Sequence, residues 1–296
     1  MTAAGPPGPS PLAVVADYQL LEPVNDGTTA RLFRAQPPPR LGLAPGRTVI
    51  LKLLEGTGDR AFSRLSRLLQ TFAAVDNAYL VTLLDAGQHE DVFFYTTPDW
   101  TWGTLARPRA ELAVARAVAA VADVCRAAHG LHEAGIAHRD ISPSAVLLHD
   151  AGAWLGELDL ARAAMGGGSV TSMAALHSVG YVDPACIRGD APSRASDVYS
   201  LGATLHFALT TTSIHPNLPE DDPVMAVRRV LRDAPHLSAS LDDLAAEIIS
   251  ACLHPDPSAR PATAAELANL VDELARRAGP GGPGGPGADA GAGGPR

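Results

Sequence analysis

The segment IAHRDISPSAVLL, residues 136–148, decides how this chain of 296 residues is interpreted. It lies in a half of the chain, from Arg109 onward, in which apolar residues recur at helical spacing. In the other half, from Tyr18 to about Tyr95, short strand-like runs are interrupted by one helical pattern at residues 60–72. The sequence therefore predicts a β-rich lobe and a mainly helical lobe, joined at Pro98–Trp100, with a ligand cleft between them.

Six further segments surround residues 136–148 in a fixed order. They are VILK ending at Lys52, LLDAG at 83–87, LGELDLARA from Leu155, GYVDPA from Gly180, SDVYSLGATL from Ser196 and HPDPSARP ending at Pro261. The central segment resembles the catalytic loop of protein serine/threonine kinases, H-R-D-L-x-x-x-N. Because the other segments resemble further kinase segments in the right order, the chain is identified as a degenerate, bacterial-type member of that family from about Tyr18 to Ala278.

The resemblance implies an α+β, two-lobed protein-kinase-like fold. We expect the β-rich N-lobe at residues 18–98 and the mainly helical C-lobe at residues 99–278. Residues 1–17 and the Gly/Pro-rich segment 279–296 lack apolar periodicity, so the sequence predicts that both are disordered. The Ala- and Pro-rich composition is similar to that of kinases from high-GC bacteria such as actinobacteria.

The resemblance also assigns roles to a few groups that remain. Asp140 matches the aspartate that accepts the proton of the substrate hydroxyl, and Lys52 matches the strand lysine that contacts the phosphates of ATP. Of the three glycines expected in the phosphate-binding loop, only Gly27 is present, because Asn25 and Ala30 replace the others. These groups, together with Glu157, are the expected nucleotide-binding set.

Other groups that phosphoryl transfer needs are replaced. The helix from Arg60 contains no acid to pair with Lys52, and Ile50 stands where the family places an alanine against the adenine, so its branched side chain would crowd the base. Ser142 replaces the catalytic-loop lysine, and Ala145 replaces the metal-binding asparagine and has no ligand atom. Because phosphate positioning depends on these groups acting as a unit, their joint loss should reduce catalysis strongly.

The metal-binding aspartate of the DFG motif has two candidate replacements. In one alignment Glu157 takes its place, and in an alignment shifted by one residue Asp159 does. Glutamate brings the right charge, but its extra methylene displaces the oxygens where Mg²⁺ demands near-ideal geometry. The resemblance therefore implies that no cofactor is required, that ATP binds weakly or not at all, and that Mg²⁺ binding is compromised.

The supporting scaffold is better preserved. Asp197 matches the helix aspartate that accepts hydrogen bonds from the catalytic-loop backbone, and we predict that Asp183 is the ion-pair partner of Arg260. Arg139 matches an arginine that can pair with a phosphate on the activation loop. The candidate phosphate acceptors on that loop are Ser169, Thr171 and Ser172, although small polar residues also simply favour loops.

Composition narrows the class of partner and the compartment. A net charge of −9 and no basic cluster argue against nucleic acid and against an anionic membrane surface. No apolar run approaches a membrane span, and the first ten residues lack the basic start of a secretory signal. The three cysteines lie in apolar contexts and indicate buried free thiols in a reducing cytoplasm.

We therefore expect a pseudokinase that binds a protein partner as a scaffold or allosteric regulator, with Asp140 retained but idle. The alternative is a divergent active serine/threonine kinase that uses Lys52, Asp140 and either Glu157 or Asp159 with a single metal ion. A third hypothesis, phosphorylation of a small molecule, is weaker because the HRD and SDVYSLG segments resemble protein kinases.

Overall fold

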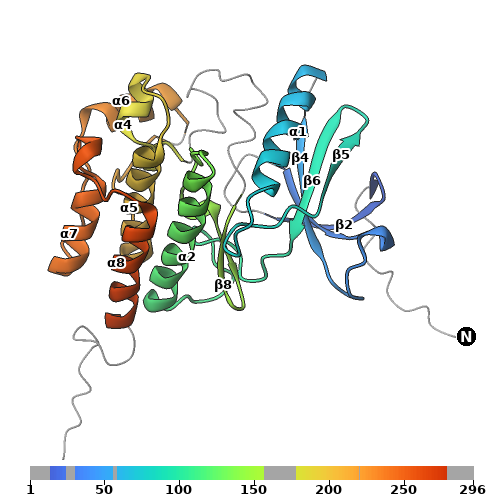
Figure 1. Ribbon diagram of the computed structural model, residues 1–296, viewed down its shortest axis with the longest axis horizontal. Helices are drawn as coiled ribbons and strands as arrows, with labels where there is room; N and C mark the ends of the chain where they lie inside the picture. Colours follow the sequence, from blue (N-terminus) through green and yellow to red (C-terminus); the bar gives the residue numbers. More distant parts are fainter. Residues whose placement is uncertain (1–13, 25–30, 56–58, 157–177, 220, 279–296) are drawn as a thin grey trace, which may run out of the picture.

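The computed structural model describes residues 14–24, 31–55, 59–156, 178–219 and 221–278. These residues form two lobes: a curled sheet with one helix against it, and a helical body beside it (Figure 1). The predicted α+β fold with a β-rich N-lobe and a mainly helical C-lobe is confirmed. The predicted disordered tail at residues 279–296 lies outside the described residues, as do residues 1–13 of the predicted disordered N-terminal segment.

The N-lobe contains six antiparallel strands in the order β1-β2-β3-β4-β6-β5. They are β1 (Val14–Val15), β2 (Tyr18–Val24), β3 (Arg31–Gln36), β4 (Val49–Glu55), β5 (Asp85–His89) and β6 (Val92–Pro98), with α1 at Asp59–Ala73 and the 3₁₀ turn η1 at Pro39–Leu41. β1 falls within the segment 1–17 that we predicted to be disordered, because a turn with Ala16 at φ 52° brings it back against β2.

Residues of β4 alternate between two apolar environments. Val49, Leu51 and Leu53 pack in one cluster with Tyr18 and Phe94 on one face of the sheet. The period of two in a strand places Ile50 and Lys52 on the opposite face, toward the C-lobe. The residue pairs across β4 and β6 are Ile50 with Thr97 and Lys52 with Tyr95.

The helix α1 covers this second face with an apolar stripe. Leu65, Leu69 and Phe72, at the spacing of successive helical turns, are buried. The helix begins at Asp59, one residue before the predicted start, so the acid-free segment runs from Arg60 to Ala73. The side chain of Asp59 lies outside the described set.

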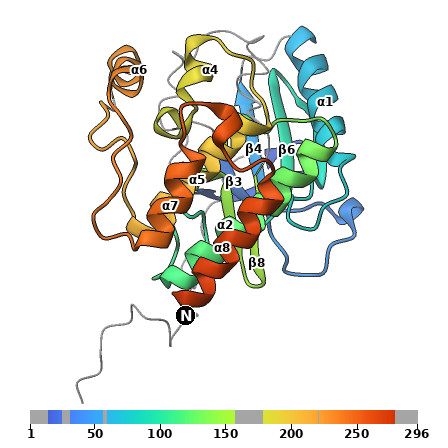
Figure 2. The ribbon, with the colours of Figure 1, turned by 60° about the vertical axis from the view of Figure 1, so that its left-hand side comes forward.

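The C-lobe is built on two largely buried helices, at residues 114–133 and 194–210. Its helices are α2 (Val114–Glu133), α4 (Pro184–Arg188), α5 (Arg194–Thr210), α6 (Pro223–Arg232), α7 (Asp243–Cys252) and α8 (Ala264–Arg277), with β7 (Val146–His149), β8 (Gly152–Leu155) and the 3₁₀ turns η2 (Pro143–Ala145), η4 (Val179–Tyr181) and η5 (Pro257–Ala259). α2 packs on both α5 and α8, and α5 packs on α7 (Figure 2). A Cβ at Gly202 would lie 2.3 Å from Cβ of Cys252, so α5 and α7 approach closely only because this residue is glycine.

None of the described helices has both the length and the apolar content needed to span a lipid bilayer. The cysteines are free thiols, with Cys125 and Cys252 buried and Cys186 half-buried, as expected from their apolar sequence contexts.

His206, near the end of α5, is held as a neutral imidazole. Its Nδ1–H donates to the carbonyl of Thr212 at 3.0 Å, and its Nε2 accepts from the backbone N–H of Ser238 at 3.1 Å. Burial lowers the pKa of His206 from its ordinary value near 6.5, and His236 nearby adds to this effect. A protonated ring could not accept from Ser238, so protonation opposes this arrangement.

We predict that the free energy of unfolding falls as the pH is lowered below about 6.5. The unfolded chain binds a proton at residue 206 more readily than the folded protein does, so this contribution is complete above pH 6.5 and is lost at lower pH. Urea unfolding between pH 7.5 and 5 should show a shallower pH dependence for His206→Gln than for the wild type. Identical pH dependence in both proteins would contradict the prediction.

Candidate functional site

Asp197, in the first turn of α5, holds the segment that contains Asp140. Its Oδ2 accepts the backbone N–H of His138 at 2.7 Å and the side-chain N–H of His132 at 2.8 Å, and its Oδ1 accepts the backbone N–H of Arg139 at 2.9 Å. The carboxyl group is buried, with 1% of the side chain exposed. Two of these charge-assisted hydrogen bonds hold the backbone of the segment in a low-dielectric environment, as the sequence predicted, and the third joins Asp197 to His132 on α2.

Arg139 adopts a strained backbone conformation at this point. Its φ of 77° lies in the left-handed region, which residues with a Cβ rarely occupy. The hydrogen bond from its N–H to Asp197 stabilises the unusual dihedral. Asp140, the next residue, is half-buried, and its own N–H donates to Nδ1 of His138 at 3.4 Å.

His138 links the catalytic loop to the strand that precedes the DFG-like segment. Its Nε2–H donates to the carbonyl of Gly156 at 3.0 Å, and the N–H of Gly156 donates to the carbonyl of Ala145 at 2.7 Å. The described chain thus runs beside residue 145 immediately before Glu157. The sequence-based candidates Gly27, Glu157, Asp159, Ser169, Thr171 and Ser172 all lie outside the described residues.

Ala145 ends the short 3₁₀ turn that follows Asp140, and its N–H donates to the backbone carbonyl of Ser142 at 2.9 Å. Ser142 is buried, with 6% exposed, whereas Ala145 is half-buried. The side chain of Ala145 is a methyl group, and its backbone carbonyl already accepts from Gly156. Position 145 therefore offers no side-chain oxygen to a cation.

Lys52 and Ile50 lie on the face of β4 that is directed toward the C-lobe. The Nζ of Lys52 is 5.9 Å from the centroid of the Tyr95 ring, within reach of a cation–π contact. Ile50 is 2% exposed and belongs to the large buried cluster that extends into the C-lobe. The structure thus places the retained lysine and the bulky isoleucine on the same side of the strand.

Arg260 and Asp183 form the predicted buried ion pair. Nη1 of Arg260 lies 2.5 Å from Oδ2 of Asp183 and also donates to the carbonyl of Ala195 at 2.8 Å, while its Nε donates to the carbonyl of His254 at 2.9 Å. The guanidinium also lies 5.2 Å from the ring centroid of Tyr199, whose pKa is raised by burial. The prediction that Asp183 pairs with Arg260 is confirmed.

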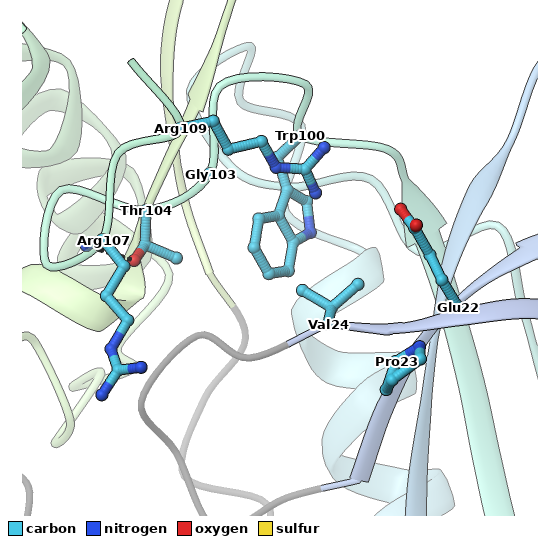
Figure 3. A pocket seen from close by; sticks show the side chains of 8 residues that line it. All are labelled: Glu22, Pro23, Val24, Trp100, Gly103, Thr104, Arg107 and Arg109. Carbon is cyan, nitrogen blue, oxygen red and sulfur yellow. Dashed lines mark hydrogen bonds between the residues drawn. The ribbon is translucent and has the colours of Figure 1, made fainter. Parts of the chain in front are cut away.

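A pocket of about 320 Å³ opens between β2 and the chain that follows the interlobe connection. Figure 3 shows its lining residues, which are Glu22, Pro23, Val24, Trp100, Gly103, Thr104, Arg107 and Arg109. Trp100 and Thr104 are buried, with 3% and 1% exposed, whereas the two arginines are exposed. Sequence reasoning did not single out these residues. The available signal was that two of only three tryptophans, Trp100 and Trp102, lie at the connection.

The fold and the loop anchored by Asp197 define a protein-kinase-like protein. The family model described as protein kinase domain matches residues 46–270, and the chain belongs to this family. The kinase domain of PknI from Mycobacterium tuberculosis has a similar structure, with a TM-score of 0.63 and 21% identity over 88% of this chain and 97% of that one. This likeness concerns the fold.

Two curated relatives are similar in sequence. The DNA damage-responsive serine/threonine-protein kinase RqkA of Deinococcus radiodurans is 31% identical over 275 residues, which cover 88% of this chain and 40% of RqkA. The serine/threonine-protein kinase PknB of Mycobacterium tuberculosis is 32% identical over 224 residues, which cover 70% of this chain and 35% of PknB. The chain therefore spans two fifths or less of the length of these relatives.

We predict that Asp197→Asn destabilises the protein by about 3 kcal/mol. An amide keeps the shape of the carboxylate, but its NH₂ group faces an N–H donor and leaves buried groups unsatisfied. Asp233→Asn is the matched control, because Asp233 pairs with Arg232 at the surface, where 47% of its side chain is exposed. Urea unfolding should separate the two variants clearly. Equal stability of the two would show that Asp197 does not anchor the loop.

Proposed function

We propose that this protein is a pseudokinase, a kinase-fold protein that acts by binding a protein partner and transfers phosphate little or not at all. The observation that carries the proposal is the methyl group of Ala145, beside the last residue before Glu157. The family implies a magnesium ligand there, and Mg²⁺ requires several oxygens in near-ideal octahedral geometry. The side chain at position 145 does not fit that ion.

Two further features support weak nucleotide binding. Ile50 places a branched side chain on the cleft-facing side of β4, where it narrows the space for a base. The stretch of α1 from Arg60 to Ala73 contains no glutamate, the residue that the family places on this helix beside the strand lysine. Because the transition state of phosphoryl transfer is stabilised by positioned charges acting together, these losses compound one another.

The retained contacts support a function that requires the folded protein but does not require phosphoryl transfer. Asp197 holds the catalytic loop, and Arg260 pairs with the buried Asp183. These two stabilising contacts of the C-lobe are therefore intact. A protein partner is the counterpart that we propose for such a scaffold, in preference to nucleic acid or membrane, because the chain carries a net charge of −9. Three free cysteines support a cytoplasmic location.

The alternative is a divergent active serine/threonine kinase. Two observations favour it: Asp140 follows directly on the backbone fixed by Asp197, and the relatives RqkA and PknB are named serine/threonine-protein kinases. Such an enzyme would use Asp140 as the base and Lys52 as the phosphate contact. The two functions differ in whether ATP loses its terminal phosphate.

A phosphoryl-transfer assay distinguishes these functions. With ATP radiolabelled in its terminal phosphate, with magnesium or manganese, and with casein as acceptor, we expect no more label on the wild type or on casein than Asp140→Asn gives. Asp140→Asn removes the proposed base and keeps its size, so it sets the background. Transfer by the wild type that Asp140→Asn abolishes would establish the alternative.

A thermal-shift titration tests nucleotide binding separately. A ligand that binds only the folded state raises Tm by an amount that grows with the logarithm of the ratio of its concentration to its Kd. We expect submillimolar ATP to leave the Tm unchanged, and magnesium to make no difference, because position 145 supplies no ligand. A rise in Tm that grows with ATP and requires magnesium would contradict this expectation.

A further inference from the structure

The connection between the lobes contains Asp99 and Trp100. Nε of Arg34 on β3 and Oγ1 of Thr48, which precedes β4, each donate to Oδ2 of Asp99 at 2.6 Å. These contacts hold Asp99 against the N-lobe, and Trp100 is the next residue along the chain. Figure 3 shows the indole of Trp100 between the lobes, turned toward Val24.

The indole is buried with the apolar side chains that face the cleft. Trp100 is 3% exposed, and Leu32 on β3 and Ile50 on β4 are 5% and 2% exposed. All three belong to one buried cluster, which also contains Leu147 on β7 of the C-lobe. An indole is a fused bicyclic ring with as many ring atoms as a purine, so it can fill the space that a nucleotide base would need.

The backbone of the connection has few free groups to offer a base. Pro98 has no N–H, and the carbonyl of Trp100 already accepts from the N–H of Gly103 at 3.0 Å. Gly103 makes this tight turn with a φ of 80°, and a Cβ there would lie 2.5 Å from the carbonyl oxygen of Arg107. A purine presents donors and acceptors along its edge, and burying them without partners is unfavourable.

We propose that Trp100 is an internal occupant of the base site: its indole fills the slot bordered by Leu32 and Ile50 and excludes the base of a nucleotide. This inference rests on the weak nucleotide binding of the proposed function and names the residue responsible. The pocket of about 320 Å³ lined by Val24, Trp100 and Thr104 is the space that remains beside the indole.

Removing the indole should open the slot to adenosine. Adenosine is the appropriate probe because it carries the base without phosphates, so its binding does not depend on Lys52, on position 145 or on a metal ion. In isothermal titration calorimetry, we expect Trp100→Ala to bind adenosine at least tenfold more tightly than the wild type. Trp100→Val, which keeps a buried apolar side chain, should show a smaller gain and guards against failure of the alanine variant to fold.

Trp102→Ala is the matched control. It removes an indole two residues further along the chain. Trp102 is half-buried, its Nε1–H donates to Oδ1 of Asp150 at 2.7 Å, and it does not line the pocket. We expect it to bind adenosine as the wild type does. If Trp100→Val folds and binds adenosine no more tightly than Trp102→Ala, the indole does not block the site. Adenosine binding by the wild type with the affinity of Trp100→Val would also overturn the proposal.

The result of the adenosine titration can be distinguished from the result of the phosphoryl-transfer assay that tests the proposed function. If the wild type transfers phosphate while Trp100→Val still gains adenosine affinity, the pseudokinase assignment fails, and Trp100 restricts the base site without closing it. If the wild type transfers no phosphate and neither Trp100 variant gains affinity, the role of Trp100 fails and the pseudokinase assignment stands.

Discussion

The carboxylate of Asp197 is the interaction on which the rest of the site depends. It joins α5 to the backbone of His138 and Arg139 and to the side chain of His132 on α2, all away from solvent. A buried carboxylate is stable only when its oxygens are satisfied, so these contacts must form together. The left-handed backbone of Arg139, and hence the direction in which Asp140 leaves the loop, follows from this single anchor.

The residues that support the fold match the pattern of the family more closely than the residues at the nucleotide and metal positions do. The groups that hold the C-lobe together are intact, whereas the residues at positions 50, 142 and 145 differ from those that the family uses to grip ATP and its metal. The fold accommodates these residues, because Ile50 packs within the large buried cluster and Ser142 is buried as well. This separation is compatible with the weak nucleotide binding that we propose, because a protein kinase domain can stay folded without the groups that bind ATP.

Sequence periodicity predicted the parts of the structure that local patterns determine. The helical pattern at residues 60–72 lies within one residue of the observed bounds of α1. The pairing of Asp183 with Arg260 followed from the cost of burying an unpaired guanidinium. The burial of Trp100 could not be predicted, because it belongs to a cluster whose members, such as Leu32 and Ile50, are distant in the sequence. Short elements such as β7 and β8 carried too little periodicity to recognise.

The buried pair of Asp183 and Arg260 also constrains how the chain is made. The two residues are 77 positions apart, and the helix α8, which packs on α2, follows the arginine. During synthesis on the ribosome, Asp183 cannot pair with Arg260, and the face of α2 that packs on α8 cannot be covered, until the last part of the C-lobe has been made. The N-lobe sheet is complete at Pro98, long before that point, so the two lobes finish folding at different stages of synthesis.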